Sequence, residues 1–118
     1  MIDKCCSASV ALKNLATNQS VMVGGFGVPG TPMFLLKEVL KMDIHGLTLI
    51  KNEANEAGLG ISELIENGQV KKLIASHLGL NTKVIEMMNN EELEIELFPQ
   101  GILAEKVRAG GAGLLGIV

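Results

Sequence analysis

The chain has 118 residues, which is enough for one domain with a modest core and too few for two. Apolar residues make up 47% and charged residues 19%, a composition typical of a globular fold rather than of a disordered chain. The net charge of −3 comes without a basic block, which argues against a nucleic acid ligand. Three Phe and no Trp or Tyr also argue against a surface on which bases stack.

The first residues and the cysteines indicate a cytoplasmic protein. Cys5 and Cys6 are adjacent and form no disulfide framework, which suits a reducing compartment. Residues 1–9 contain no apolar core region, so they do not predict a signal peptide. No apolar run approaches the length that spans a membrane, and we expect no membrane association.

Apolar periodicity, turn residues and capping residues define nine expected elements. In chain order they are a helix over 7–15, a strand over 20–23, a helix over 32–42, a strand over 47–51, a helix over 61–66, a strand over 70–76, a helix over 82–89, a strand over 93–98 and a helix over 101–109. Because strands and helices alternate, we predict a single α/β domain over residues 1–118, with an open, mostly parallel sheet and helices covering its faces.

Three details refine these elements. Thr31 is expected to cap the second helix, with Pro32 as its first residue. Leu93, Ile95 and Leu97 alternate with glutamates, so the last strand is expected to bury one face. The glycines at 110 and 111 are expected to end the last helix.

The turn at 24–32 follows the first strand and precedes a helix, where ligands gather in parallel sheets. Gly25, Gly27 and Gly30 satisfy the pattern G-x-G-x-x-G, and Glu53 lies where a ribose-binding acid would sit. Pro29 within the turn removes one amide donor. From this pattern alone, a dinucleotide site, another anion site and a plain turn are about equally supported.

Residues 21–32 read V-M-V-G-G-F-G-V-P-G-T-P, which is three apolar residues followed by G-G-F-x-x-x-G-x-P. This run resembles the signature of the α subunit of family I coenzyme A transferases. Residues 99–113 resemble its P-Q-G-T-L-A-E-R-I-R-A-G-G-A-G run, with Ile102 in place of Thr and Lys106 in place of Arg. Residues 47–52 and 70–77 are also similar. Thr17 departs from the Asp or Asn that usually precedes the signature.

This resemblance implies a subunit of an enzyme that moves coenzyme A (CoA) between short carboxylic acids of the acetate, acetoacetate, butyrate or succinate type. A glutamate of a β subunit would be the nucleophile, so the chain alone would be inactive and would work in a hetero-oligomer. No permanent cofactor is implied, because the CoA thioester is the substrate. Gln100 would donate to the oxyanion. The residues implied at the CoA site are Gly24, Gly25, Phe26, Gly27, Val28, Pro29, Gly30 and Asn52.

Several other polar residues are given a structural interpretation. Glu66-Asn67-Gly68 copies the sequence around the β-subunit nucleophile, but its place at the end of a short helix predicts a surface helix stop. Glu53 and Glu56 are interpreted as solvated loop acids. They form no metal-ligand pattern with His45 or His77, and no metal site is predicted.

The apolar segment at 110–118 would normally lead into further core, so we expect the N-terminal portion of a longer subunit. Missing strands would leave an open sheet edge, which invites self-association. Two other functions remain as alternatives: a dinucleotide-binding, Rossmann-like oxidoreductase domain and a non-catalytic interaction remnant.

Overall fold

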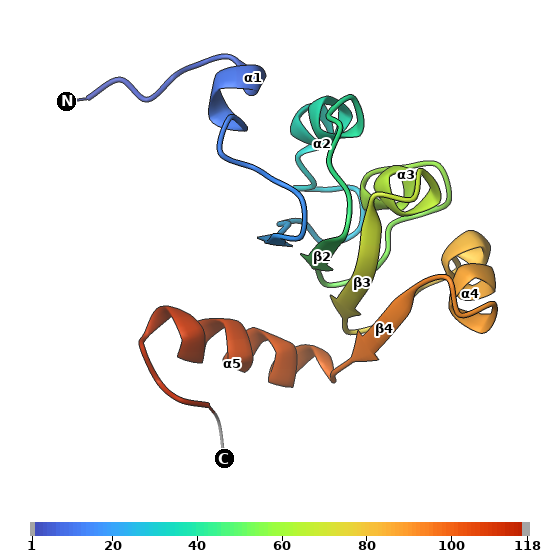
Figure 1. The fold of residues 1–118 in the computed structure, drawn as a ribbon. Helices are drawn as coiled ribbons and strands as arrows, with labels where there is room; N and C mark the ends of the chain where they lie inside the picture. The colour runs from blue at the N-terminus through green and yellow to red at the C-terminus, as the bar shows by residue number, and fades with distance from the viewer. Residues whose placement is uncertain (1, 117–118) are drawn as a thin grey trace.

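The computed structural model describes residues 2–116, so Met1 and the last two residues of the expected apolar tail lie outside the described part. Helices and strands alternate along the chain as expected (Figure 1). Their bounds are α1 Ala8–Ala11, β1 Ser20–Met22, α2 Met33–Leu40, β2 Leu47–Ile50, α3 Ile61–Glu66, β3 Val70–Ala75, α4 Thr82–Asn89, β4 Glu94–Leu97 and α5 Gln100–Gly111.

The strands form one sheet in the order β1-β2-β3-β4, and every neighbouring pair is parallel. The predicted open parallel α/β sheet is therefore confirmed. The central strands β2 and β3 supply Leu47, Leu49, Leu73 and Ala75, whose side chains are all buried. Each strand is followed by a helix that returns the chain to the same end of the sheet, so the carboxyl ends of all four strands meet at one edge.

Helices α2, α3 and α4 stand in a row over one face of the sheet (Figure 1). A strand order that never reverses, combined with right-handed connections, places successive helices on the same face. The core lies between this row and the sheet. Its helical members are Leu36, Val39, Ile61, Leu64, Ile65 and Val84.

The opposite face of the sheet carries no such row, which corrects the expectation that helices cover both faces. Within residues 2–116, only α5 lies beside this face, where Leu103 and Val107 line pockets together with Met22, Ile50 and Ile74. Met22 remains 62% exposed. The physical reason is the strand order. Because the order never reverses and crossover connections are right-handed, every connecting helix lies on the other face.

The bounds of α1 and α5 differ from the prediction. Ser7 caps α1 through a bond from the Val10 amide, but this helix ends at Ala11 because it buries no residue that would hold further turns. Helix α5 begins one residue early and runs through both glycines to Gly111. Its stop is Gly113, which has a φ of 75°, and the Leu114 amide donates back to the Ala109 carbonyl.

The start of α2 also differs, because Thr31 does not cap it. Pro32 is the residue before the helix, and no side chain caps its free amides. The Thr31 hydroxyl instead donates to the Gly27 carbonyl at 2.6 Å. The turn therefore uses this hydroxyl for its own structure.

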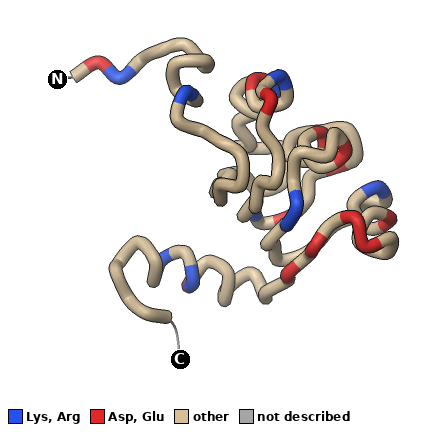
Figure 2. Tube along the Cα trace, viewed as in Figure 1, with Lys and Arg blue, Asp and Glu red and all other residues tan. Residues whose placement is uncertain are grey.

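Strand β4 follows the predicted alternation only in part. Leu93 is buried, but Leu97 is 50% exposed, because no described strand or helix lies beyond this edge strand. On the opposite face, Glu94 and Glu96 flank Lys72 of β3 at 3.5 and 2.8 Å. Figure 2 shows the acidic residues that gather along this end of the sheet.

Within residues 2–116, no helix combines the length and the apolar character that crossing a membrane requires.

Candidate active site

The glycine turn between β1 and α2 is a tight loop closed by its own backbone. The Phe26 amide donates to the Pro29 carbonyl at 2.9 Å, and the Thr31 amide donates to the Val28 carbonyl at 3.1 Å. Gly25, Gly27 and Gly30 all have positive φ angles, of 107°, 66° and 79°. These are backbone conformations that glycine adopts most easily, which explains the residue type at these positions.

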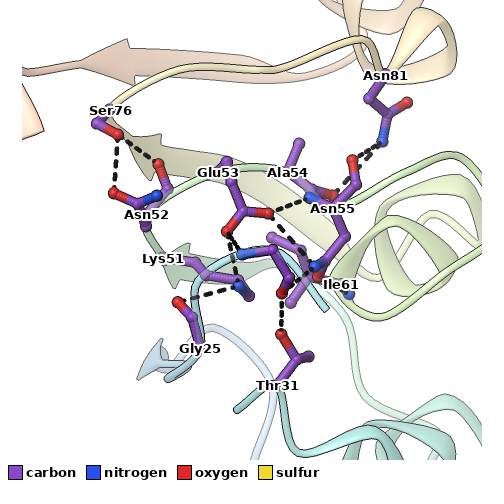
Figure 3. A network of polar contacts seen from close by, with 11 residues as sticks. Gly25, Thr31, Lys51, Asn52, Glu53, Ala54, Asn55, Ile61, Ser76 and Asn81 are labelled. Atoms are coloured by element: carbon purple, nitrogen blue, oxygen red, sulfur yellow. Dashed lines mark hydrogen bonds and ion pairs between the residues drawn. The ribbon is translucent and has the colours of Figure 1, made fainter. Parts of the chain in front are cut away.

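A buried ion pair lies directly beneath this turn (Figure 3). The ammonium of Lys51, at the end of β2, is 3.0 Å from Oε1 of Glu53, and both residues are buried. The Gly27 amide donates to the same oxygen at 2.8 Å. The Lys51 ammonium also lies 3.5 Å from the Gly25 carbonyl. The pair thus connects the segment after β2 to the turn after β1.

Asn55 completes this connection, and the sequence analysis did not single it out. Its backbone amide donates to Oε2 of Glu53 at 2.9 Å, and its side-chain amide donates to the Gly27 carbonyl at 3.1 Å. Its Oδ1 accepts from the Ile61 amide at the start of α3. Asn55 has a φ of 61°, which Asn tolerates better than most residues, and this preference was the available sequence signal.

Glu53 is not the solvated loop acid that the sequence predicted, whereas Glu56 is exposed as expected. Burial by itself raises the pKa of the Glu53 carboxyl. The bonds from Gly27, Lys51 and Asn55 outweigh burial, so this pKa lies below its ordinary value and the carboxylate is ionised at neutral pH. A buried acid bound beneath the turn is not free to bind a ribose.

A pocket of about 360 Å³ opens at the carboxyl ends of β1 and β2. Four residues expected at the site line it: Gly24, Phe26, Asn52 and Gln100. The remainder of its wall is mostly apolar and comes from both strands and from α5. These residues are Met22, Val23, Ile50, Lys51, Leu103, Ala104 and Val107.

Asn52 lines this pocket and carries an unused hydrogen-bond donor. The Ser76 hydroxyl lies 2.7 Å from the Asn52 carbonyl oxygen and 3.0 Å from its Oδ1, so the acceptor side of the amide is engaged (Figure 3). Its Nδ2 is buried, and no described residue accepts a hydrogen bond from it. An unsatisfied buried donor costs about 1–3 kcal/mol, which a ligand oxygen would relieve.

Gln100 is the first residue of α5 and is exposed. Pro99 precedes the helix with a φ of −51° and a ψ of 142°, an extended conformation that turns the chain from β4 into α5. The helix therefore starts beside the carboxyl ends of the strands and presents Gln100 to the same pocket as Asn52.

The other residues expected at the site lie elsewhere around the turn. Gly27 and Val28 line a second pocket of about 210 Å³, on the side of Glu53 and Asn55. Gly25, Pro29 and Gly30 form the turn itself. The structure thus divides the expected site between two pockets on either side of one loop.

The position of Glu66 agrees with the predicted surface helix stop. Glu66 ends α3 and is exposed, and its carboxylate accepts from the Ser62 hydroxyl and the Gly58 amide. His45 and His77 are both exposed. Among residues 2–116, no group of three or more His, Cys, Asp or Glu side chains is arranged to hold a metal ion.

The sequence profile of the coenzyme A transferase family matches residues 6–118. This chain therefore belongs to the coenzyme A transferase family.

Curated relatives agree with this assignment. The chain is 46% identical over 99 residues to the alpha subunit of the acetoacetyl-CoA:acetate/butyrate CoA transferase of Clostridium acetobutylicum, covering 84% of this chain and 45% of that protein. It is 44% identical to the alpha subunit of the acetate CoA-transferase of Escherichia coli K12, with the same coverage. It is 40% identical to one subunit of the succinyl-CoA:3-ketoacid coenzyme A transferase of Helicobacter pylori J99, covering 88% and 45%. The chain spans about half the length of these relatives.

Solved structures share the fold. An acyl-CoA transferase from E. coli O157:H7, in a thioester complex with CoA, superposes with a TM-score of 0.81 at 22% identity, over 95% of this chain and 23% of that one. The decarboxylase AibA/AibB superposes with a TM-score of 0.78 at 23% identity, over 92% and 44%. Because a decarboxylase has the same architecture, the fold alone does not define the reaction.

Proposed function

We propose that this chain is part of the α subunit of a CoA transferase and contributes the CoA thioester site and a donor to the oxyanion. The observation that carries the proposal is the buried, unpartnered Nδ2 of Asn52, a residue that lines one pocket together with Gln100 and the glycine turn. The substrates would be acyl-CoA thioesters and short carboxylic acids, as the names of the relatives say of those proteins.

The partner would be a β subunit that carries the catalytic glutamate. That carboxylate attacks the thioester carbonyl and expels the CoA thiolate, leaving an acyl anhydride on the glutamate. The thiolate then attacks the glutamyl carbonyl and releases the first carboxylate, which gives a glutamyl-CoA thioester. Each attack places negative charge on a carbonyl oxygen, and an amide donor aimed at that oxygen lowers the barrier.

In this scheme the chain binds and orients the thioester and does not supply the nucleophile. The side-chain amide of Gln100 would donate to the oxyanion, and Asn52 would donate to an oxygen of the bound acyl-CoA. The apolar side chains of Met22, Ile50 and Leu103 line the wall beside these two amides. The free, exposed Cys5 and Cys6 suit the reducing cytoplasm that we propose as its location.

The dinucleotide alternative is disfavoured by the turn itself. In that class of site, the amides of the glycine turn and the following helix bind a pyrophosphate. Here the Gly27 amide already binds the Glu53 carboxylate, and that acid is buried rather than free for a ribose. Calorimetry with NAD and with acetyl-CoA separates the two functions, and a folded chain that binds neither would favour an interaction remnant.

The direct test is acyl exchange. Residues 1–118 are joined to the C-terminal half of the Clostridium α subunit, the product is combined with the matching β subunit, and transfer of CoA from acetoacetyl-CoA to labelled acetate is measured. We expect Gln100→Ala to lower kcat by roughly 100-fold to 1,000-fold, since one oxyanion donor is removed. The matched control is Glu105→Gln, an exposed residue of the same helix whose ion pair with Arg108 contributes little. Unchanged exchange by Gln100→Ala would remove Gln100 from the mechanism.

A further inference from the structure

The carboxylate of Glu53 is held as proteins hold a bound anion. Oε1 accepts hydrogen bonds from the Gly27 amide at 2.8 Å and from the Lys51 ammonium at 3.0 Å. Oε2 accepts hydrogen bonds from the backbone amide of Asn55 at 2.9 Å and from the side-chain amide of Asn55 at 3.3 Å. Four donors therefore surround a side chain that is only 8% exposed.

Packing alone does not explain this arrangement. Burying a carboxylate is costly, and apolar side chains in place of both Lys51 and Glu53 would fill the same space without burying any charge. What the carboxylate adds is a connection between two segments that are distant in sequence. One segment is the glycine turn around Gly27, and the other is the run from Lys51 to Asn55 that follows β2.

The connection lies between the two pockets of the site. Gly24 and Phe26 on one side of the turn face the pocket that contains Asn52 and Gln100. On the other side, Glu53 itself lines the second pocket together with Gly27. Any movement of the Gly27 amide therefore alters both walls, because Gly27 lies directly beside Phe26 in the turn.

We propose that the Glu53 carboxylate is the resident anion of the glycine turn and acts as a positioning residue for ligand binding. It occupies the Gly27 amide and fixes the turn so that Gly24 and Phe26 face Asn52 across the pocket. The turn then binds an acyl-CoA through its pocket side and leaves no place for a phosphate at Gly27. The ligand-binding part of this inference rests on the proposed function, whereas the resident anion does not.

Chemical rescue tests the resident anion directly. In Glu53→Ala an amide, an ammonium and a vacant volume remain, so a small carboxylate in solution can take the vacated position. We expect the melting temperature to fall by at least about 10 °C, since one partner of a buried ion pair is lost. Sodium formate should restore at least half of that loss, and sodium chloride at equal ionic strength should not.

Two variants serve as controls in the same assay. Glu53→Gln keeps the position filled, so its melting temperature should not respond to formate beyond the response to chloride. Glu56→Ala removes an exposed acid from the same loop and should change the melting temperature by no more than about 3 °C in either salt. Equal effects of formate and chloride on Glu53→Ala, or an equal formate response of Glu53→Gln, would overturn the proposal.

A titration of the unmodified chain covers the case in which Glu53→Ala does not fold. The amide proton shift of Gly27, followed by NMR as the pH is lowered, should change together with the carboxyl carbon shift of Glu53. Glu53→Gln should abolish this coupled change. A Gly27 shift that ignores the protonation of Glu53 would contradict the bond that carries the proposal.

The positioning role has its own readout. Calorimetry on the reconstituted complex of the acyl-exchange test should show that Glu53→Ala binds acetyl-CoA at least about tenfold more weakly than the unmodified complex, and that formate restores the affinity. Unchanged affinity would leave Glu53 with a role in stability alone and overturn the positioning role. If the unmodified complex binds no acetyl-CoA, the proposed function fails, and the formate and NMR experiments then test the resident anion on their own.

Discussion

The segment from Lys51 to Asn55 contains the densest polar network described in this chain, immediately after the central strand β2. Two kinds of polar group are combined there. Glu53 and Lys51 satisfy each other, whereas the Nδ2 of Asn52 is left without a partner among the described residues. A satisfied network stiffens the backbone next to one unsatisfied donor, and such a donor is positioned before any ligand arrives.

The lowered pKa of Glu53 makes folding stability depend on pH in a predictable direction. Above its ordinary value of 4.5, the carboxyl is ionised in both the folded and the unfolded chain, and its bonds contribute fully. As the pH falls below 4.5, the unfolded chain takes up the proton first, and this stability is lost down to the lower pKa of the folded state. Urea unfolding as a function of pH measures the effect.

The matched variant for this measurement is Glu53→Gln, which has no proton to exchange at this position. We expect it to be less stable than the unmodified chain at neutral pH and to show a flatter decline in the acidic range. Parallel pH profiles for the two proteins would show that other carboxyls dominate the acid unfolding of this chain.

The turn between β1 and α2 differs from the glycine-rich end of α5, although both are glycine segments. Gly25 has a φ of 107°, and a Cβ there would lie 2.6 Å from the Thr31 amide nitrogen. Gly110 lies inside a helix, and a Cβ there meets no described atom within 4 Å. The first glycine is required by the backbone, whereas the second only costs the helix conformational entropy.

Alanine at these two positions should therefore act in opposite directions. Gly25→Ala should destabilise the fold by roughly 1–3 kcal/mol, because it combines a left-handed backbone with a steric clash. Gly110→Ala should stabilise it by about 0.5–1 kcal/mol, because alanine is the better helix former. Urea unfolding of both variants gives the two values, and a loss of stability in Gly110→Ala would indicate a contact of this helix that the structure does not contain.

At the scale of the whole molecule, the sheet is covered on one face and largely open on the other. Helix α3 buries four of its six residues against the sheet and the neighbouring helices. Helix α5 has 12 residues and buries only Leu103 and Ala109. Since α5 carries Gln100 and part of the pocket wall, the least buried large element also bears part of the candidate site.

Hydrogen exchange should reproduce this asymmetry. Amides of β2 and β3 should exchange last, through global unfolding, because both strands are central and buried. Amides of α5 should exchange well before those of α3, even though α5 is twice as long. Mass spectrometry of peptides from both helices measures the difference. Equal protection of the two helices would mean that α5 is covered in solution, for example by a second copy of the chain.

The alternation of strands and helices was readable from the sequence because each element carries its own local signal. Apolar runs gave β2 and β3 to within one residue, and turn residues such as Asn67 and Gly68 gave the end of α3. Helix α1 was predicted too long: none of its own residues is buried, and Leu12 and Leu15, which pack partly against the core, do so from outside the helix. Alternation predicted a buried Leu97, but the residue is half exposed, because alternation does not reveal which strand forms the edge of the sheet.

The sequence by itself determined the family, the parallel α/β fold and the grouping of Gly24, Asn52 and Gln100, since motifs and strand ends are local features of a chain. Only the tertiary structure decided the role of Glu53 and Asn55, the one-sided helix layer and the free donor of Asn52. Each of these depends on which distant segments meet: Gly27 reaches Glu53 across 26 positions, and Ser76 reaches Asn52 across 24. The sequence shows which side chains are charged. Their hydrogen-bond and ion-pair partners depend on how the strands pair in the folded sheet.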